Sequence, residues 1–145
     1  ALALFIDSMD LAKRIVNNAA NRLDYQMDDN GFFPAEMERT ISLHYTAFVM
    51  NAFFHIAQMA EKTGIDFWKL TTPSGKSLQK AFTVLKPYFA DEKNWEGQQI
   101  KPYDYEDGYM LMMEAYNHFK CRDCEQAVER LADDKAPRLR IKLLY

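Results

Sequence analysis

The sequence lacks several features that would assign a protein to a class at once. Lys and Arg (18) nearly balance Asp and Glu (21), and no basic run marks a contact with a phosphate backbone. No apolar run approaches the roughly 18 to 20 residues that cross a bilayer, because Asn51, His55 and Gln58 interrupt the longest one. We therefore expect a soluble protein that binds neither nucleic acid nor membrane.

Strands and cysteines are also scarce. No stretch of useful length alternates apolar with polar residues, as a half-buried strand would. Cys121 and Cys124 form the sequence CRDC, a spacing that fits a redox pair, half of a zinc site or a disulfide. A zinc site needs two more ligands, and only His118 lies nearby. Because the surrounding residues have helical character, the sequence favours two partly buried thiols or one surface thiol.

Helical periodicity is what the sequence does contain. Apolar residues recur at helical spacing over residues 9–23, 35–62, 76 to about 87, 105–119 and 121–132. The second of these stretches is long for a globular helix, so we expect a bend or break near residues 40–42. With 145 residues, 48% of them hydrophobic, the chain has the size and composition of one domain with a real core. The prediction is an all-α fold of antiparallel helix hairpins, either a bundle or part of a helical toroid.

The first residues, ALALFI, resemble the last apolar turns of an element that begins elsewhere. The chain has no initiator Met, and neither the charged start nor the cleavage site of a signal peptide is visible. We expect a fragment of a longer protein.

Several short motifs follow one another in a fixed order between residues 26 and 68. They are Gln26, Asp29 with Gly31, Pro34, Glu36, Arg39, Leu43-His44-Tyr45, and Gly64, Asp66 and Trp68. This order resembles the alginate lyase family of polysaccharide lyases, and the likeness continues weakly through residues 75–89. Several motifs in one order make the resemblance far more specific than any one of them.

The resemblance implies a toroid of antiparallel helix pairs around a groove. Residues 1–145 would be a single domain, the C-terminal part of that toroid, because the family's Asn-Asn-His motif, found about one hairpin earlier, is absent. The implied partners are an anionic uronate polysaccharide and the missing N-terminal half of the domain. No metal and no organic cofactor are implied. Since such polymers do not enter the cytoplasm intact, we expect a bacterial periplasmic or secreted protein.

Such lyases cut by β-elimination: a base removes the C5 proton beside the carboxylate, and an acid protonates the departing oxygen at C4. Removing that proton places more negative charge on the carboxyl group, so donors must neutralise it. One such preorganised donor is worth about 3 to 4 kcal/mol. The resemblance points to Tyr45 for proton transfer and to Arg39 for contact with the carboxylate or the tyrosine. On one straight helix the two lie about 120° apart, so geometry alone leaves their contact open.

Four further residues are candidates for substrate binding. Glu36 is expected to pair with Arg39 at i, i+3, because a bare carboxylate would repel an anionic polymer. Gln26 either donates to the sugar or caps a turn, and His44 either supports the site or is structural. Trp68 belongs to a set of aromatic residues that suit stacking on sugar faces: Phe32, Phe33, Trp68, Trp95, Tyr103 and Tyr105.

Residues 94–108 hold so many aromatics that we expect at least one to contact glycan. His55 and His118 lie in apolar helical surroundings, and we interpret both as structural. The alternative function is a noncatalytic helical glycan-binding or scaffold protein. A third hypothesis, a helical-toroid hydrolase, needs two acids across a groove, for which Asp104, Glu106 and Asp107 are the candidates.

Overall fold

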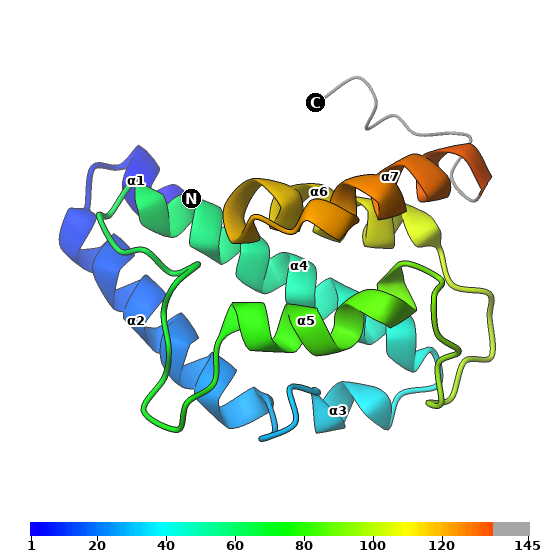
Figure 1. The fold of residues 1–145 in the computed structure, drawn as a ribbon. Helices are drawn as coiled ribbons and strands as arrows, with labels where there is room; N and C mark the ends of the chain where they lie inside the picture. Colours follow the sequence, from blue (N-terminus) through cyan, green and yellow to red (C-terminus); the bar gives the residue numbers. More distant parts are fainter. Residues whose placement is uncertain (135–145) are drawn as a thin grey trace.

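The computed structural model describes residues 1–134, which fold entirely into helices and connecting segments (Figure 1). None of these helices is both long and apolar enough to cross a membrane. The only strand-like pairing among these residues is an isolated antiparallel bridge between Ile41 and Gln99. The helices are α1 (Leu2–Phe5), α2 (Met9–Gln26), α3 (Pro34–Met37), α4 (Ser42–Glu61), α5 (Leu78–Phe89), α6 (Tyr105–Phe119) and α7 (Arg122–Asp134). The all-α prediction is confirmed.

Helix α4 lies at the centre of the fold, in contact with α2, α3, α5 and α6. It is apolar on most of its circumference, and Ala47, Met50 and Ala57 are fully buried. Helices α4, α5, α6 and α7 run in alternating directions, so that successive helices form antiparallel hairpins (Figure 1). These helices and α2 share one continuous hydrophobic core, which positions the first turn of α4 beside α3 and the segment before α6.

The break expected in the long helical stretch is present. Residues 38–41 are not helical, so the stretch divides into α3 and α4. Pro34 begins α3, in agreement with the preference of proline for the first turn. Gly64, with φ +77°, ends the turn after α4 in the left-handed conformation that favours glycine. Helix α5 continues two residues beyond the expected end, and Pro87 lies within its last turn.

The interpretation of the cysteines as thiols was wrong, because Cys121 and Cys124 form a disulfide. Lys120, with φ +58°, ends α6 and separates the two cysteines from that helix. They therefore lie at the start of α7 with Cα atoms 5.3 Å apart, within the span of a disulfide.

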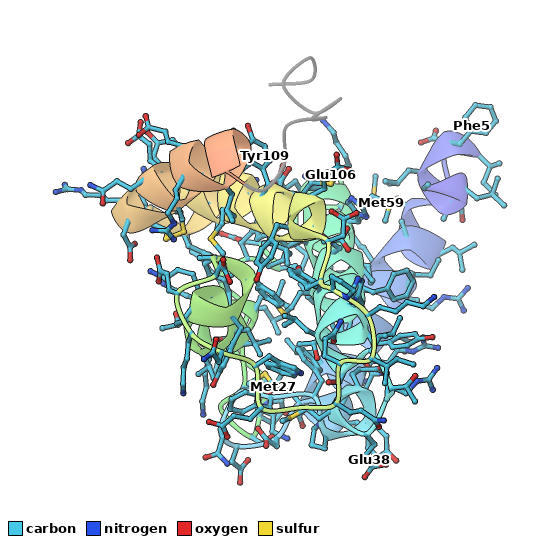
Figure 2. All side chains as sticks on the ribbon, turned by 90° about the vertical axis from the view of Figure 1, so that its right-hand side faces the viewer. Phe5, Met27, Glu38, Met59, Glu106 and Tyr109 are labelled. Carbon is cyan, nitrogen blue, oxygen red and sulfur yellow. A yellow bond between two sulfur atoms is a disulfide. The ribbon has the colours of Figure 1, made fainter. Side chains whose placement is uncertain are left out.

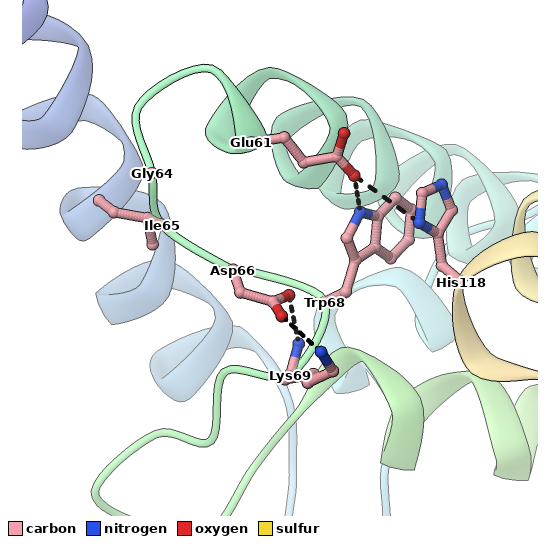
Figure 3. Close-up of a pocket in the computed structure, with 7 residues that line it drawn as sticks. All are labelled: Glu61, Gly64, Ile65, Asp66, Trp68, Lys69 and His118. Atoms are coloured by element: carbon pink, nitrogen blue, oxygen red, sulfur yellow. Dashed lines mark hydrogen bonds and ion pairs between the residues drawn. The ribbon is translucent and has the colours of Figure 1, made fainter.

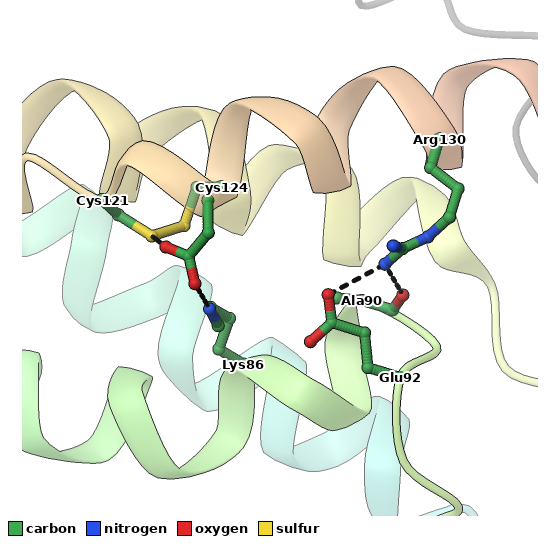
Figure 4. Close-up of polar contacts among 7 residues, drawn as sticks. Lys86, Ala90, Glu92, Cys121, Cys124 and Arg130 are labelled. Carbon is green, nitrogen blue, oxygen red and sulfur yellow. Dashed lines mark hydrogen bonds and ion pairs between the residues drawn. A yellow bond between two sulfur atoms is a disulfide. The ribbon is translucent and has the colours of Figure 1, made fainter.

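Two polar clamps hold α7 against α5 and the residues that follow α5 (Figure 4). Lys86 pairs with Asp123 beside the disulfide. Arg130 donates to the carbonyl oxygen of Ala90 at 2.8 Å and to Glu92 at 3.0 Å. These contacts fasten α7, and with it the α6–α7 hairpin, to α5 and the residues that follow it.

Apolar side chains on α1 and α2 remain exposed. Leu2 (73%), Phe5 (87%) and Ile6 (58%) are exposed, as is Ile15 (49%) on α2. Phe5 projects away from the other helices at the edge of the molecule (Figure 2). The described residues thus leave one side of α1 and α2 without an apolar cover.

We predict that Gly108→Ala lowers the melting temperature by about 5 °C or more. Alanine usually stabilises a helix interior by about 1 kcal/mol relative to glycine, but here an added Cβ would lie 2.3 Å from the carbonyl oxygen of Phe89. Helices α5 and α6 would therefore have to separate. Thermal unfolding followed by circular dichroism measures the change. Asn117→Ala, at an exposed position of α6, is the control and should not lower the melting temperature. A Gly108→Ala variant more stable than the wild type would contradict the packing.

Candidate active site

Arg39 and Tyr45 meet at the break between α3 and α4. The Arg39 guanidinium carbon lies 4.3 Å from the centroid of the Tyr45 ring, in the geometry of a cation–π contact worth about 0.5 to 1 kcal/mol at an exposed position. Because the chain leaves the helix at residues 38–41, the 120° offset of a straight helix does not apply. Arg39 is exposed and Tyr45 is half-buried, so both are open to solvent.

Hydrogen bonding and charge interaction with Tyr45 raise the pKa of Arg39, and the Glu36 carboxylate adds a smaller contribution. The guanidinium is therefore a permanent cation beside a phenol. This combination can bind a carboxylate and move a proton within one small region.

The pairing of Glu36 with Arg39 at i, i+3 is not formed. Helix α3 ends at Met37, so Arg39 is no longer on the same helix as Glu36. Among the ion pairs of the described residues, none joins the two, and the guanidinium instead lies over Tyr45. Gln26 is the last residue of α2, and its side chain is exposed.

His44, the neighbour of Tyr45 in the sequence, is held on both sides of its ring. Its Nδ1 lies 2.7 Å from Nε2 of Gln99, and the backbone N–H of Asp104 points to its Nε2 at 3.3 Å. Tyr103 packs edge-on against the ring at a centroid distance of 5.1 Å. Protein groups therefore occupy both ring nitrogens of His44.

Residues 95–104, which we call the capping segment, run along the start of α4. Ser42 donates its N–H to the carbonyl oxygen of Gln98 at 2.9 Å, and Leu43 donates its N–H to Oε1 of Gln99 at 3.1 Å. The Ile41 side chain provides no cap of its own. The first turn of α4, which carries Tyr45, is thus capped by residues 56 positions downstream.

Most of the aromatic residues proposed for sugar stacking are engaged within the protein. Trp95 donates to Ser42 Oγ at 2.6 Å and packs against Phe32 and Tyr88. Burial raises the pKa of Tyr103 well above its usual value, with smaller contributions from nearby acidic groups, so this phenol is a poor proton donor. Tyr105 donates to Asp91 at 2.5 Å, and burial, with that contact, raises its pKa to about 12.

Phe33 is also internal, with 1% of its surface exposed. The expected contact between glycan and at least one aromatic residue of 94–108 stays a prediction.

Trp68 lies in a different pocket, of about 370 Å³, beyond the C-terminal end of α4 (Figure 3). Its indole stacks on the His118 ring at 3.9 Å and donates to Glu61 at 2.9 Å. Tyr45 lies in the first turn of α4, a helix of 20 residues that spans about 30 Å. The structure therefore does not bring Trp68 to the Arg39–Tyr45 pair.

The two remaining histidines differ from each other. His118 is half-buried between Trp68 and Glu114, whose carboxylate lies 3.5 Å away, and its structural role stays a prediction. His55 is exposed on α4, so its expected apolar surroundings were wrong.

The acids proposed for a hydrolase all lie at the start of α6. Asp104 caps that helix by accepting the N–H of Glu106 at 3.0 Å, and Asp107 is one turn further on. Burial, mainly, raises the pKa of Asp107. Three acids in one helical turn do not form a pair across a groove.

The described residues include one group with the composition of a metal site, Cys121, Asp123 and Cys124. Its two sulfur atoms are joined in the disulfide, so they are not available as thiolate ligands.

A fold of antiparallel helix hairpins with an exposed arginine over a tyrosine at a helix break defines a helical protein that holds a cation and a phenol side by side at its surface. A crystal structure of an alginate lyase from Bacteroides ovatus superposes with a TM-score of 0.78 and 27% sequence identity, covering 88% of this chain and 35% of that one. The alginate lyase family model matches residues 1–95, and the chain belongs to this family. The antiparallel hairpins are thus part of a helical toroid, as expected.

The chain spans about a third of the length of the Bacteroides ovatus protein. No match was found among curated proteins. Both Arg39 and Tyr45 lie within the segment that the family model matches.

The contacts of the capping segment were missed at the sequence level. Gln99 lies beyond the residues that the family model matches, and none of the motifs found in the sequence includes Gln99 or Ser42. Their partners are more than 50 residues away, so no local spacing could have revealed them.

We predict that Gly97→Ala detaches part of the capping segment. An added Cβ would lie 2.5 Å from both Ser42 Oγ and Trp95 Nε1, so the hydrogen bond between these two groups cannot persist. The melting temperature should fall by about 4 °C or more, and tryptophan fluorescence should shift to longer wavelength. Glu96→Ala, an exposed change in the same segment, should alter neither quantity. Unchanged fluorescence in Gly97→Ala would contradict the contact.

Proposed function

We propose that this chain is part of a polysaccharide lyase that cleaves a β-1,4-linked uronate polymer, such as alginate, polymannuronate or glucuronan, by β-elimination. The observation that carries the proposal is the Arg39 guanidinium over the Tyr45 ring, within the segment that matches the alginate lyase family. Residues 1–145 act in this proposal as one domain, the C-terminal part of a longer catalytic toroid.

The reaction requires two things of the site: stabilisation of negative charge on the substrate carboxylate, and transfer of a proton. The first is needed because the C5 proton of a uronate is weakly acidic, since its removal moves negative charge onto the neighbouring carboxylate. Arg39 meets the first demand, since a permanent cation at an exposed position can bind that carboxylate and stabilise the added charge. Its planar guanidinium suits bidentate contact with a carboxylate.

Tyr45 meets the second demand, proton transfer. A phenolate can accept the C5 proton, and the phenol so formed can protonate the oxygen that leaves from C4. In β-elimination the electron pair of the C5–H bond forms the C4–C5 double bond, and the C4–O bond breaks. No water is consumed, and the product carries an unsaturated end.

The remaining candidates take supporting roles. His44, whose ring is held by Gln99 and by the edge-on Tyr103 ring, supports the first turn of α4 in place of direct sugar contact. Glu36 adds to the charge balance around Arg39, and Gln26 is available at the surface for hydroxyl groups of the polymer. Trp68 would reach only a distant sugar unit, because it lies beyond the other end of α4.

The exposed apolar side chains of α1 and α2 support a partner within the same protein. Phe5 and Leu2 are among the most exposed large side chains, and the chain spans only 35% of its structural relative. We assign this side to contact with the preceding, N-terminal half of the toroid.

The reaction needs no metal or organic cofactor. Its polymeric substrate places the protein in the bacterial periplasm or outside the cell.

Two product assays on a panel of alginate blocks, glucuronan and hyaluronan test the function. Absorbance near 235 nm reports unsaturated ends, and a reducing-end assay reports every chain break. A lyase raises both signals, a hydrolase raises only the second, and a glycan-binding protein raises neither. The assay should include the longest natural polypeptide that carries this chain, since activity in that polypeptide alone would mean that residues 1–145 hold part of a site.

Tyr45→Phe should reduce kcat by about 100-fold or more, because the hydroxyl that transfers the proton is lost. The fold should survive, since the ring remains. The rate of absorbance increase at 235 nm is the measurement. Tyr25→Phe is the matched control, since Tyr25 is 91% exposed and distant in sequence, and it should keep full activity. Near-normal turnover in Tyr45→Phe would remove Tyr45 from the mechanism.

Arg39→Ala should raise KM and lower kcat together, because the guanidinium binds the carboxylate in the ground state and more strongly in the transition state. Loss of one such donor corresponds to about 100-fold in kcat. Arg14→Ala removes an equal charge from an exposed position of α2 and should change neither constant by more than about twofold. An Arg39→Ala variant with a raised KM and an unchanged kcat would mean that Arg39 binds the ground state and the transition state equally, which contradicts its proposed role.

A further inference from the structure

Gln99 makes three contacts with its one amide group. Its Oε1 accepts the N–H of Leu43 at 3.1 Å, in the first turn of α4. Its Nε2 donates to the carbonyl oxygen of Lys101 at 2.8 Å and lies 2.7 Å from Nδ1 of His44. Two of these partners belong to the helix turn that carries Tyr45: Leu43 donates its N–H from that turn, and His44 is the neighbour of Tyr45 in the sequence.

The orientation of the Gln99 amide follows from its partners. Exchanging its oxygen and nitrogen would bring two donors together at the Leu43 N–H and two acceptors together at the Lys101 carbonyl. The amide nitrogen therefore faces His44, and Nδ1 of His44 is the acceptor.

This contact also selects the tautomer of His44. A neutral imidazole has only one nitrogen with a free lone pair, while two donors face the ring, Gln99 at 2.7 Å and the Asp104 N–H at 3.3 Å. The shorter contact, from an amide fixed by two other bonds, takes the lone pair. The ring proton then lies on Nε2, so the Asp104 N–H at 3.3 Å approaches a protonated nitrogen and contributes little to holding the ring.

Helix α4 has no local substitute for Gln99. Ile41 precedes the helix without a side-chain cap, and the Leu43 N–H has Gln99 as its acceptor. An amide group left without a partner at this point would loosen the first turn. That turn sets where the Tyr45 ring lies relative to Arg39, which comes from the other side of the helix break.

We propose that Gln99 is a positioning residue: it caps the first turn of α4, fixes the ring of His44, and thereby holds Tyr45 against Arg39. The role in catalysis rests on the proposed lyase function, whereas the positioning itself does not. Gln99 lies outside the segment matched by the family model, so the match does not assign it a role.

The positioning can be measured in this chain without any polymer. Because the Arg39 guanidinium lies over the Tyr45 ring, the ring current should move the Arg39 Hε and Hδ signals upfield in the proton NMR spectrum. Tyr45→Leu gives the value of these signals without the ring. In Gln99→Ala, the Arg39 signals should move at least halfway towards that value.

Gln98→Ala is the matched control, because Gln98 contributes its backbone carbonyl to the cap while its side chain is exposed. Its Arg39 signals should match those of the wild type. Arg39 signals that are unchanged in Gln99→Ala would overturn the proposal.

Gln99→Glu provides a second test if Gln99→Ala fails to fold. Glutamate keeps an acceptor for the Leu43 N–H but turns an acceptor towards Nδ1 of His44, which then needs the proton. The ¹⁵N spectrum should show His44 protonated at Nε2 in the wild type and at Nδ1 in Gln99→Glu. Gln98→Glu, with the same added charge one residue away, should keep the wild-type pattern. A wild-type His44 protonated at Nδ1 would overturn the assignment.

In a polypeptide that cleaves polymer, Gln99→Ala should lower kcat about tenfold or more and leave KM within about twofold, because misplacement of a reacting group affects the transition state. Equal kcat values in Gln99→Ala and Gln98→Ala would contradict the link to catalysis. If no polymer is cleaved, the NMR results still decide whether Gln99 positions Tyr45, so failure of the lyase proposal is distinguishable.

Discussion

Helix α4 is buried along most of its length, and the arrangement of the other helices follows from the need to cover it. This helix is apolar around most of its circumference, so it must be covered on several sides at once. Helices α2, α3, α5 and α6 provide that cover; α7 packs against α6 and is fastened to α5 and the residue after it by two polar clamps. A helix fixed so firmly along its length offers a rigid base for reactive groups at its end.

The start of α4 combines a cap from a distant segment with the contact between Arg39 and Tyr45. A helix that begins after a break leaves N–H groups without partners, and the capping segment satisfies two of them from 56 residues away. The same break frees Arg39 to fold back over Tyr45. The loss of helix at residues 38–41 therefore has two effects. It leaves N–H groups of α4 that need a cap from elsewhere, and it allows the Arg39 cation to lie beside the Tyr45 phenol.

Much of the fold followed from the sequence because its signals are local. Helical periodicity located the long helices, and the unusual length of residues 35–62 indicated the break. Other features depend on contacts distant in the sequence. The disulfide needed the left-handed turn at Lys120, and the separation of Trp68 from Tyr45 needed the full length of α4. The family motif supplied Tyr45 and Arg39, but Gln99 has meaning only once the capping segment is placed beside α4.

The proposed function requires a uronate chain to bind at the start of α4, against Arg39 and Tyr45. A titration of the ¹⁵N-labelled protein with a short, saturated oligouronate, followed by backbone and Arg Nε NMR signals, tests this binding. We expect the largest shifts on Arg39, Tyr45 and the capping segment. Shifts centred on the pocket of Trp68 and His118, or no shifts at millimolar oligouronate, would contradict it.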